Sequence, residues 1–105
     1  MKDGFLRVAC ATPEIKVADC ENNANNIIEL IEEANNNETS LIVFPELCIT
    51  AYTCNDLFYQ NELLDSAISA MFKITDSTKN MDIISIVGLP VKKGAELYNC
   101  AAVIY

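Results

Sequence analysis

A carboxylate stands directly behind a short apolar run, and this placement suits general acid-base chemistry. Residues 41–44 are Leu-Ile-Val-Phe, Pro45 follows them, and Glu46 comes next. Four consecutive large apolar residues are typical of a buried strand, and Pro45 ends it because proline has no N–H for a strand ladder. Since α/β proteins keep their chemistry at the carboxyl ends of parallel strands, Glu46 is a candidate catalytic residue. The pattern alone also allows a simple solvated loop residue.

Few other groups in the chain are candidates for a nucleophile. Cys48 is near Glu46, but two residues along an extended chain place both side chains on one side without aiming one at the other. The chain has no histidine, so it cannot form a Cys-His pair by itself. Lys92 and Lys93 precede Gly94 and are typical of an exposed turn. Glu46 is therefore the strongest candidate for chemistry.

Two segments resemble a known enzyme family. Residues 44–46 are Phe-Pro-Glu, and Tyr52 follows further along the chain. This pattern is similar to the first catalytic segment of the carbon-nitrogen hydrolase (nitrilase) superfamily, which has Phe-Pro-Glu and then Gly-Tyr. The continuation at 53–58, Thr-Cys-Asn-Asp-Leu-Phe, resembles the glutaminase domain of the glutamine-dependent NAD synthetases within that superfamily. The segments 4–9 and 12–19 point the same way. The resemblance covers essentially the whole chain.

The resemblance implies a glutaminase that works through a Glu-Lys-Cys triad. Glu46 would be the base that takes the thiol proton and later activates water, and Tyr52 would line the substrate channel. The lysine and the cysteine would lie beyond this chain, so the chain alone is expected to be inactive. Because a solvated carboxylate is a weak base toward a thiol, we expect Glu46 to be partly desolvated or beside a cation.

The resemblance also implies partners and cofactors outside the chain. The family hydrolyses glutamine to glutamate and ammonia, and a synthetase domain that uses ATP and Mg then amidates nicotinate adenine dinucleotide to NAD. No cofactor or metal is expected within the chain itself. The family's domain is well over twice as long, so we expect residues 1–105 to be its incomplete N-terminal portion. Ala51 stands where the family usually has glycine, and a positive φ there would cost about 1 kcal/mol.

Composition and charge exclude several classes of function. The chain has 51% hydrophobic and 21% charged residues, which is typical of a soluble globular protein, and its net charge is -8. Such an acidic surface repels phosphate groups, so we expect neither nucleic-acid nor membrane binding. The amino terminus shows no signal peptide, and we expect a cytoplasmic protein. Five cysteines without a Cys-x-x-Cys pair are typical of reduced, mostly buried thiols and argue against a zinc site.

Hydrophobic periodicity predicts a regular order of strands and helices. The predicted strands are a buried strand over 5–11, then 41–44, 83–89 ending in Gly88-Leu89-Pro90, and 97–104. One predicted helix begins after Asp19, a good N-cap, and ends at the asparagine run 35–37, and a second covers about 61–79. The predicted inward residues are Ala24, Ile27, Ile28, Ile31 and Ala34 in the first helix, and Leu64, Ala67, Ile68, Met71 and Thr75 in the second.

This order predicts an α/β fold. Helical crossovers make the first three strands parallel, the last strand is antiparallel, and both helices lie on one face of the mixed sheet. We expect Val43, Ile84 and Ile86 in the core. The resemblance implies that the opposite face packs on a second sheet, with residues 1–105 as the N-terminal portion of a nitrilase-type α-β-β-α sandwich. A bare sheet face favours association, so we expect a homo-oligomer.

Two alternative functions stay open. An aliphatic amidase or carbamoylase of the same superfamily would share Phe-Pro-Glu, and only the segment 53–58 argues against it. A non-enzymatic α/β interaction module, with Glu46 as a surface acid, is the other alternative. A longer reading frame with a lysine shortly after Tyr105, a later cysteine and an ATP-pyrophosphatase signature would favour the NAD synthetase.

Overall fold

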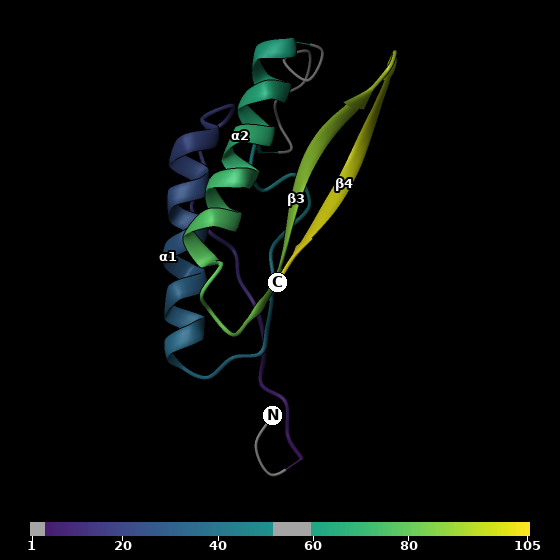
Figure 1. The fold of residues 1–105 in the computed structure, drawn as a ribbon. Helices are drawn as coiled ribbons and strands as arrows, with labels where there is room; N and C mark the ends of the chain where they lie inside the picture. Colours follow the sequence, from purple (N-terminus) through teal and green to yellow (C-terminus); the bar gives the residue numbers. More distant parts are fainter. Residues whose placement is uncertain (1–3, 52–59) are drawn as a thin grey trace.

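The computed structural model describes residues 4–51 and 60–105. Within these residues the chain forms a four-stranded sheet and two helices, as predicted. Figure 1 shows the two helices beside the last two strands of this sheet. The elements in chain order are β1 (Val8–Cys10), α1 (Cys20–Asn36), β2 (Leu41–Val43), α2 (Asn61–Thr78), β3 (Ile84–Lys93) and β4 (Glu96–Ile104).

The sheet is mixed, and its strands lie in the order β1-β2-β3-β4. β1, β2 and β3 are parallel because a helix returns the chain to the same end of the sheet after β1 and after β2. β4 pairs antiparallel with β3 through the two-residue loop Gly94–Ala95. Both helices lie on one side of the sheet and pack against each other (Figure 1). The predicted topology is confirmed.

α1 has the cap and the apolar stripe that its sequence predicts. The Asp19 carboxylate accepts a hydrogen bond from the backbone N–H of Asn22 at 3.1 Å, which satisfies one of the free donors of the first turn. At the other end, the backbone N–H of Asn37 donates to the carbonyls of Glu33 and Ala34. The predicted inward residues are all buried, as are Cys20 and Asn23.

The inward face of α2 differs from the prediction. Thr75 is exposed, and its hydroxyl donates to the Met71 carbonyl one turn earlier. The buried residues of this helix are Leu63, Leu64, Ala67, Ala70, Ile74 and Thr78. Since Ile68 and Met71 are only partly buried, the true stripe is rotated by about one residue from the predicted one.

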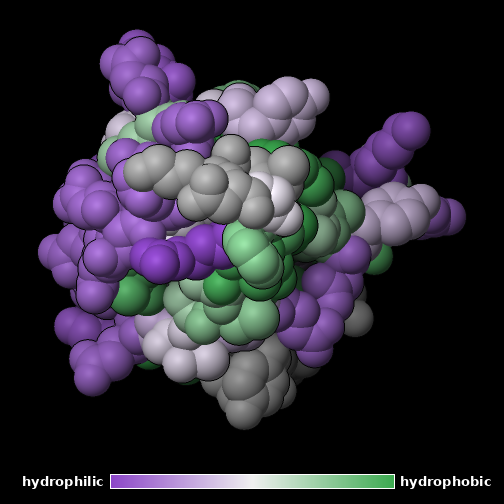
Figure 2. Space-filling view, turned by 90° about the horizontal axis from the view of Figure 1, so that it is seen from below, coloured by the Kyte–Doolittle hydropathy of each residue, from purple (hydrophilic) through white to green (hydrophobic). Residues whose placement is uncertain are grey.

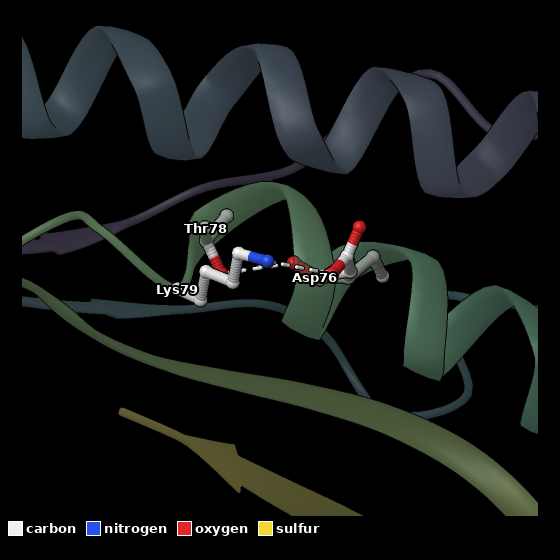
Figure 3. Close-up of polar contacts among 4 residues, drawn as sticks. Asp76, Thr78 and Lys79 are labelled. Atoms are coloured by element: carbon white, nitrogen blue, oxygen red, sulfur yellow. Dashed lines mark hydrogen bonds and ion pairs between the residues drawn. The ribbon is translucent and has the colours of Figure 1, made fainter.

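Two side-chain hydrogen bonds form at the C-terminal end of α2 (Figure 3). The Thr78 hydroxyl donates to the Ile74 carbonyl at 2.8 Å, and Lys79 Nζ donates to Asp76 Oδ1 at 3.3 Å. The ion pair is exposed, so it contributes little to stability. The buried hydroxyl of Thr78 is satisfied within its own helix.

The first strand is shorter and more exposed than predicted. β1 comprises Val8–Cys10 only, and it pairs with β2 alone at the edge of the sheet. Phe5, which the prediction placed in a buried strand, is 80% exposed. The apolar residues before Val8 therefore extend beyond the part of the sheet that the helices cover.

The third strand is longer than predicted, because Gly88-Leu89-Pro90 do not end it. β3 continues to Lys93 as a ribbon with β4 (Figure 1). Proline is tolerated inside this strand because β2 pairs only with Ile84–Ile86, so on that side no strand of the described residues pairs with β3 at Pro90. Lys92 and Lys93 are exposed before the loop at Gly94, where φ is 62°, as expected for a tight hairpin turn.

The two faces of the sheet are occupied differently. On the covered face, toward the helices, Ile42, Val87 and Leu89 are at most 2% exposed. The other face, called the open face below, carries the alternate residues of the strands. These are Val8, Cys10, Leu41, Val43, Ile84, Ile86, Ala101 and Val103.

The prediction that Val43, Ile84 and Ile86 form the core is wrong. Ile84 is 42% exposed, and Val43 and Ile86 are half-buried, because their side chains point away from the helices. Val8 and Val103 beside them are 57% and 56% exposed. Seen from below, hydrophobic side chains reach the surface in the middle of the view, whereas hydrophilic ones gather on the side of α1 (Figure 2).

Candidate active site

Glu46 lies in a turn at the carboxyl end of β2. The backbone N–H of Phe44 donates to the Ile86 carbonyl at 3.0 Å and continues the ladder between β2 and β3. Pro45 has no N–H to offer, and residues 46–50 form the turn. The predicted position of Glu46, just beyond a parallel strand and its terminal proline, is confirmed.

The turn is held by buried backbone contacts. Ala51 N donates to the Leu47 carbonyl at 2.8 Å, and Ala18 N donates to the Thr50 carbonyl at 2.9 Å. Asn23, fully buried on α1, donates from Nδ2 to the Ile49 carbonyl at 2.8 Å. Because residues 48–51 are buried, these bonds are shielded from water, and the backbone that carries Glu46 is fixed.

Gly88 on β3 lets this turn pass directly over the sheet. A Cβ at position 88 would lie 2.4 Å from Leu47 N and 2.9 Å from Glu46 Cα, closer than atoms can approach. Ile49 N also donates to the Gly88 carbonyl at 3.2 Å. Gly88 therefore sets how close Glu46 comes to the sheet. The signal in the sequence is a glycine within an apolar strand, which often marks a close backbone approach.

Leu47 in the turn and Ala51 directly after it have the left-handed backbone conformation. Leu47 has φ 52° and Ala51 has φ 73°. The expected cost at Ala51 therefore applies, about 1 kcal/mol relative to glycine. The buried hydrogen bonds of the turn offset such strain, since they fix this geometry from several sides.

The carboxylate of Glu46 is exposed and has a neutral partner. Asn99 Nδ2 on β4 donates to Glu46 Oε2 at 3.0 Å. In the part of the chain that the structure describes, no Lys or Arg forms an ion pair with Glu46. The expectation that Glu46 is partly desolvated or beside a cation is thus not met by these residues. Asn99 was not singled out from the sequence.

Cys48, although close to Glu46 in sequence, is not placed for catalysis. Its thiol is buried, and Sγ donates to the Gly88 carbonyl at 3.8 Å. Burial raises the pKa of the Cys48 thiol, which disfavours the reactive thiolate. Cys20 is also buried, but Cys10 is exposed on the open face, so the expectation of mostly buried thiols holds only in part. Tyr52 lies outside the described residues.

The described residues hold neither a cluster of metal ligands nor a membrane-spanning helix. Among them, no three His, Cys, Asp or Glu side chains come together in a way that could hold a metal ion. Neither α1 nor α2 is long and apolar enough to cross a membrane.

A family comparison assigns this arrangement to a class of enzymes. The model of the carbon-nitrogen hydrolase family matches residues 7–105. The chain belongs to the carbon-nitrogen hydrolase family. Among curated relatives, a glutamine-dependent NAD(+) synthetase from Aquifex aeolicus is 35% identical over 101 residues, which are 96% of this chain and 18% of that protein. One from Mycobacterium tuberculosis is 29% identical over 102 residues, 97% of this chain and 15% of that protein.

Solved structures agree with the family assignment. A glutamine-dependent NAD(+) synthetase from Cytophaga hutchinsonii superposes with a TM-score of 0.88 and 37% identity, over 94% of this chain and 17% of that one. An amidase from Nesterenkonia sp. superposes with a TM-score of 0.77 at 22% identity, over 98% of this chain and 39% of that one, which shows a shared fold. The α/β fold is thus part of a nitrilase-like fold, as predicted.

The chain is much shorter than the proteins it resembles. It spans between 15% and 18% of the length of the curated NAD synthetases that it matches. Within those proteins the match falls on the carbon-nitrogen hydrolase domain, which is the predicted glutaminase domain.

Proposed function

We propose that this chain supplies the catalytic base, Glu46, of the glutaminase domain in a glutamine-dependent NAD synthetase. The observation that carries the proposal is the presentation of Glu46 on a fixed turn over Gly88, in a chain that superposes on such a synthetase at a TM-score of 0.88. Rigid placement of an acid at the carboxyl end of a parallel strand suits a group that must move protons.

The proposed reaction is hydrolysis of the side-chain amide of glutamine. A cysteine thiolate attacks the amide carbon, a donor stabilises the oxyanion of the tetrahedral intermediate, and ammonia leaves as that intermediate collapses to the thioester. Water then hydrolyses the thioester and releases glutamate. Glu46 takes the proton of the thiol in the first step and activates water in the second. The cysteine and the lysine of the triad lie outside residues 1–105, so the chain alone is expected to be inactive. Tyr52 is proposed to line the substrate channel.

The ammonia is proposed to pass to a synthetase domain of the same protein. That domain would use ATP and Mg to amidate nicotinate adenine dinucleotide, and the great length of the relatives supports its presence. The ATP-dependent step is assigned to that domain and not to residues 1–105. A cytoplasmic location is proposed because the substrates belong to nucleotide metabolism.

The open face is proposed to be covered by a second sheet from the rest of the domain. Its exposed apolar side chains, among them Val8, Ile84 and Val103, are of the kind that normally pack against another layer. Glu46 lies beside this face, so the same cover would exclude water from its carboxylate. That cover would supply the desolvation which the described residues do not.

The test uses the full-length protein that contains this chain. Glu46→Gln should lower glutamine hydrolysis by about 10²- to 10⁴-fold, because the variant keeps the shape of the side chain but cannot take a proton. Glutamate release measures the hydrolysis, and NAD formation from free ammonia checks that the synthetase domain is intact. Glu32→Gln, at an exposed position on α1, is the matched control and should leave both activities unchanged.

Two outcomes would contradict the proposal. Near-normal glutaminase turnover in the Glu46→Gln protein would show that Glu46 is not the base. A wild-type protein that hydrolyses simple aliphatic amides but not glutamine, even in the presence of the synthetase substrates, would instead favour an amidase of the same family.

A further inference from the structure

The hydrogen bond between Asn99 and Glu46 joins two distant parts of the chain. The residues are 53 positions apart, and Asn99 Nδ2 lies 3.0 Å from Glu46 Oε2. Glu46 belongs to the turn after β2, whereas Asn99 belongs to β4, where it pairs with Pro90 of β3. The contact therefore forms only when the turn, β3 and β4 are all in place.

The direction of this bond follows from the chemistry of the two groups. An ionised carboxylate only accepts hydrogen bonds, so the amide nitrogen of Asn99, and not its oxygen, must face Glu46. A hydrogen bond to a charged acceptor is stronger than one between neutral groups. Because asparagine carries no charge and exchanges no proton with the carboxylate, it can orient Glu46 without becoming a rival acid or base.

The side chain of Glu46 needs such a partner. Its backbone is fixed by the turn, but an exposed glutamate side chain otherwise samples many rotamers. Within the described residues, the carboxylate has no cation to hold it. The bond from Asn99 engages Oε2, which leaves Oε1 to point at a reacting group.

β4 is a suitable element from which to orient a base. All of its residues pair with β3, from Glu96 opposite Lys93 to Ile104 opposite Ser85. Asn99 alternates along the strand with Cys100 and Ile104, which face the helices, so it lies on the same side as Ala101 and Val103. A side chain on a paired strand is held more precisely than one on a loop.

We propose that Asn99 is a positioning residue that orients the carboxylate of Glu46 toward the thiol it deprotonates. The proposal rests on the proposed function of Glu46 as the glutaminase base. Asn99 touches neither the thiol nor the substrate in this assignment and acts only through Glu46. Its loss should therefore slow the chemical step more than it weakens glutamine binding.

The experiment measures glutaminase kinetics in the full-length protein. Asn99→Ala should lower kcat by about 10- to 100-fold with little change in KM, because the base is still present but poorly aimed. Asn99→Asp has the same shape but presents an acceptor to a carboxylate, so it should lose at least as much activity as Asn99→Ala. Asn80→Ala, an exposed asparagine beyond α2, is the matched control and should behave as the wild type.

The pair of variants separates positioning from simple packing. A packing role would leave the isosteric Asn99→Asp near wild-type activity, and that result would overturn the proposal. A rise in KM at unchanged kcat in Asn99→Ala would also overturn it. If Asn99→Ala does not fold, as judged by thermal unfolding, Asn99→Asp decides alone.

Failure of this proposal is distinct from failure of the proposed function. If the Glu46→Gln protein keeps its glutaminase activity, Glu46 is not the base, and the role proposed for Asn99 fails with it. Inactive Glu46→Gln protein together with fully active Asn99 variants would leave Glu46 as the base and remove only the role of Asn99.

Discussion

The two faces of the sheet carry similar residues in opposite surroundings. Val87 on the covered face is 0% exposed, whereas Val103, on the neighbouring strand but on the open face, is 56% exposed. Glu46 and Asn99 meet on the side of the open face, whereas Ser85 is the one buried polar residue in the described strands. The covered face therefore holds this part of the fold together, and the open side is where chemistry and further packing are expected.

This contrast separates what stabilises the site from what performs its chemistry. The turn under Glu46 is anchored on the helix side, through Asn23 and the buried residues 48–51. Its carboxylate, in contrast, emerges on the exposed side. The turn can thus hold Glu46 rigidly while its carboxylate stays accessible to residues outside this chain.

The largest effect is expected at Gly88, where the turn that carries Glu46 packs against β3. Gly88→Ala would place a Cβ 2.4 Å from Leu47 N, and the colliding atom belongs to the backbone, which cannot rotate away. We expect a loss of about 3 kcal/mol in the free energy of unfolding, measured with urea, together with loss of glutaminase activity in the full-length protein. Gly94→Ala, in open space with φ 62°, is the control and should cost about 1 kcal/mol. Equal costs at the two positions would contradict the close approach.

The contrast between the faces can be measured with one substitution at two valines. Val87→Ala should lower the free energy of unfolding by about 2 kcal/mol, because it removes two buried methyl groups and leaves a cavity. Val103→Ala should change it by less than about 0.5 kcal/mol in the isolated chain, since its side chain is already in water. Urea unfolding of both variants checks this.

The full-length protein sharpens the comparison of the valines. If a second sheet covers the open face there, the cost of Val103→Ala should rise toward that of Val87→Ala. A cost that stays near zero in the full-length protein would mean that the open face remains in water.

The sequence predicted the elements but not which face the helices cover. Residues 83–87 are Ile-Ile-Ser-Ile-Val, and one polar residue in an apolar run suggests that Ser85 points to solvent and its neighbours inward. The structure has the reverse, with Ser85 buried and Ile84 exposed. A strand that is apolar on both sides has no period-two signal, so its facing depends on partners that a single run of residues does not reveal.

Only those features of the candidate site that depend on residues adjacent in sequence could be predicted. Pro45 and Glu46 are neighbours in sequence, and the end of a strand at a proline follows from the missing N–H. The contact of Glu46 with Asn99 joins residues 53 positions apart, and no local pattern specifies it. Gly88 carries a usable signal, but its place in Gly88-Leu89-Pro90 predicts the end of a strand and not the point where the turn crosses β3.

We expect the isolated chain to self-associate through its open face. A charge introduced on that face should weaken the association. Ile84→Lys should raise the dissociation constant at least about tenfold, equivalent to 1.4 kcal/mol, because the lysine would have to be desolvated in the contact. Phe72→Lys, which replaces an apolar residue 61% exposed on α2, is the control and should leave association unchanged. Light scattering over a range of concentrations measures both. A wild-type chain that stays monomeric at high concentration would contradict the view of the open face as a packing surface.

The smallest effect is expected from Ser85, the one buried polar side chain on the covered face of β3. Ser85 Oγ is buried and has no hydrogen-bond partner among the described residues. Ser85→Ala should therefore raise the free energy of unfolding by about 0.5 to 1 kcal/mol, because burying an unpaired hydroxyl costs more than the substitution loses in contacts. Thr78→Ala should have the opposite sign, since its buried hydroxyl donates to the Ile74 carbonyl at 2.8 Å and its methyl group packs in the core. Thermal and urea unfolding of both variants give the signs. A destabilised Ser85→Ala protein would show that Ser85 has a partner beyond the described residues, and that the covered face is not sealed by apolar contacts alone.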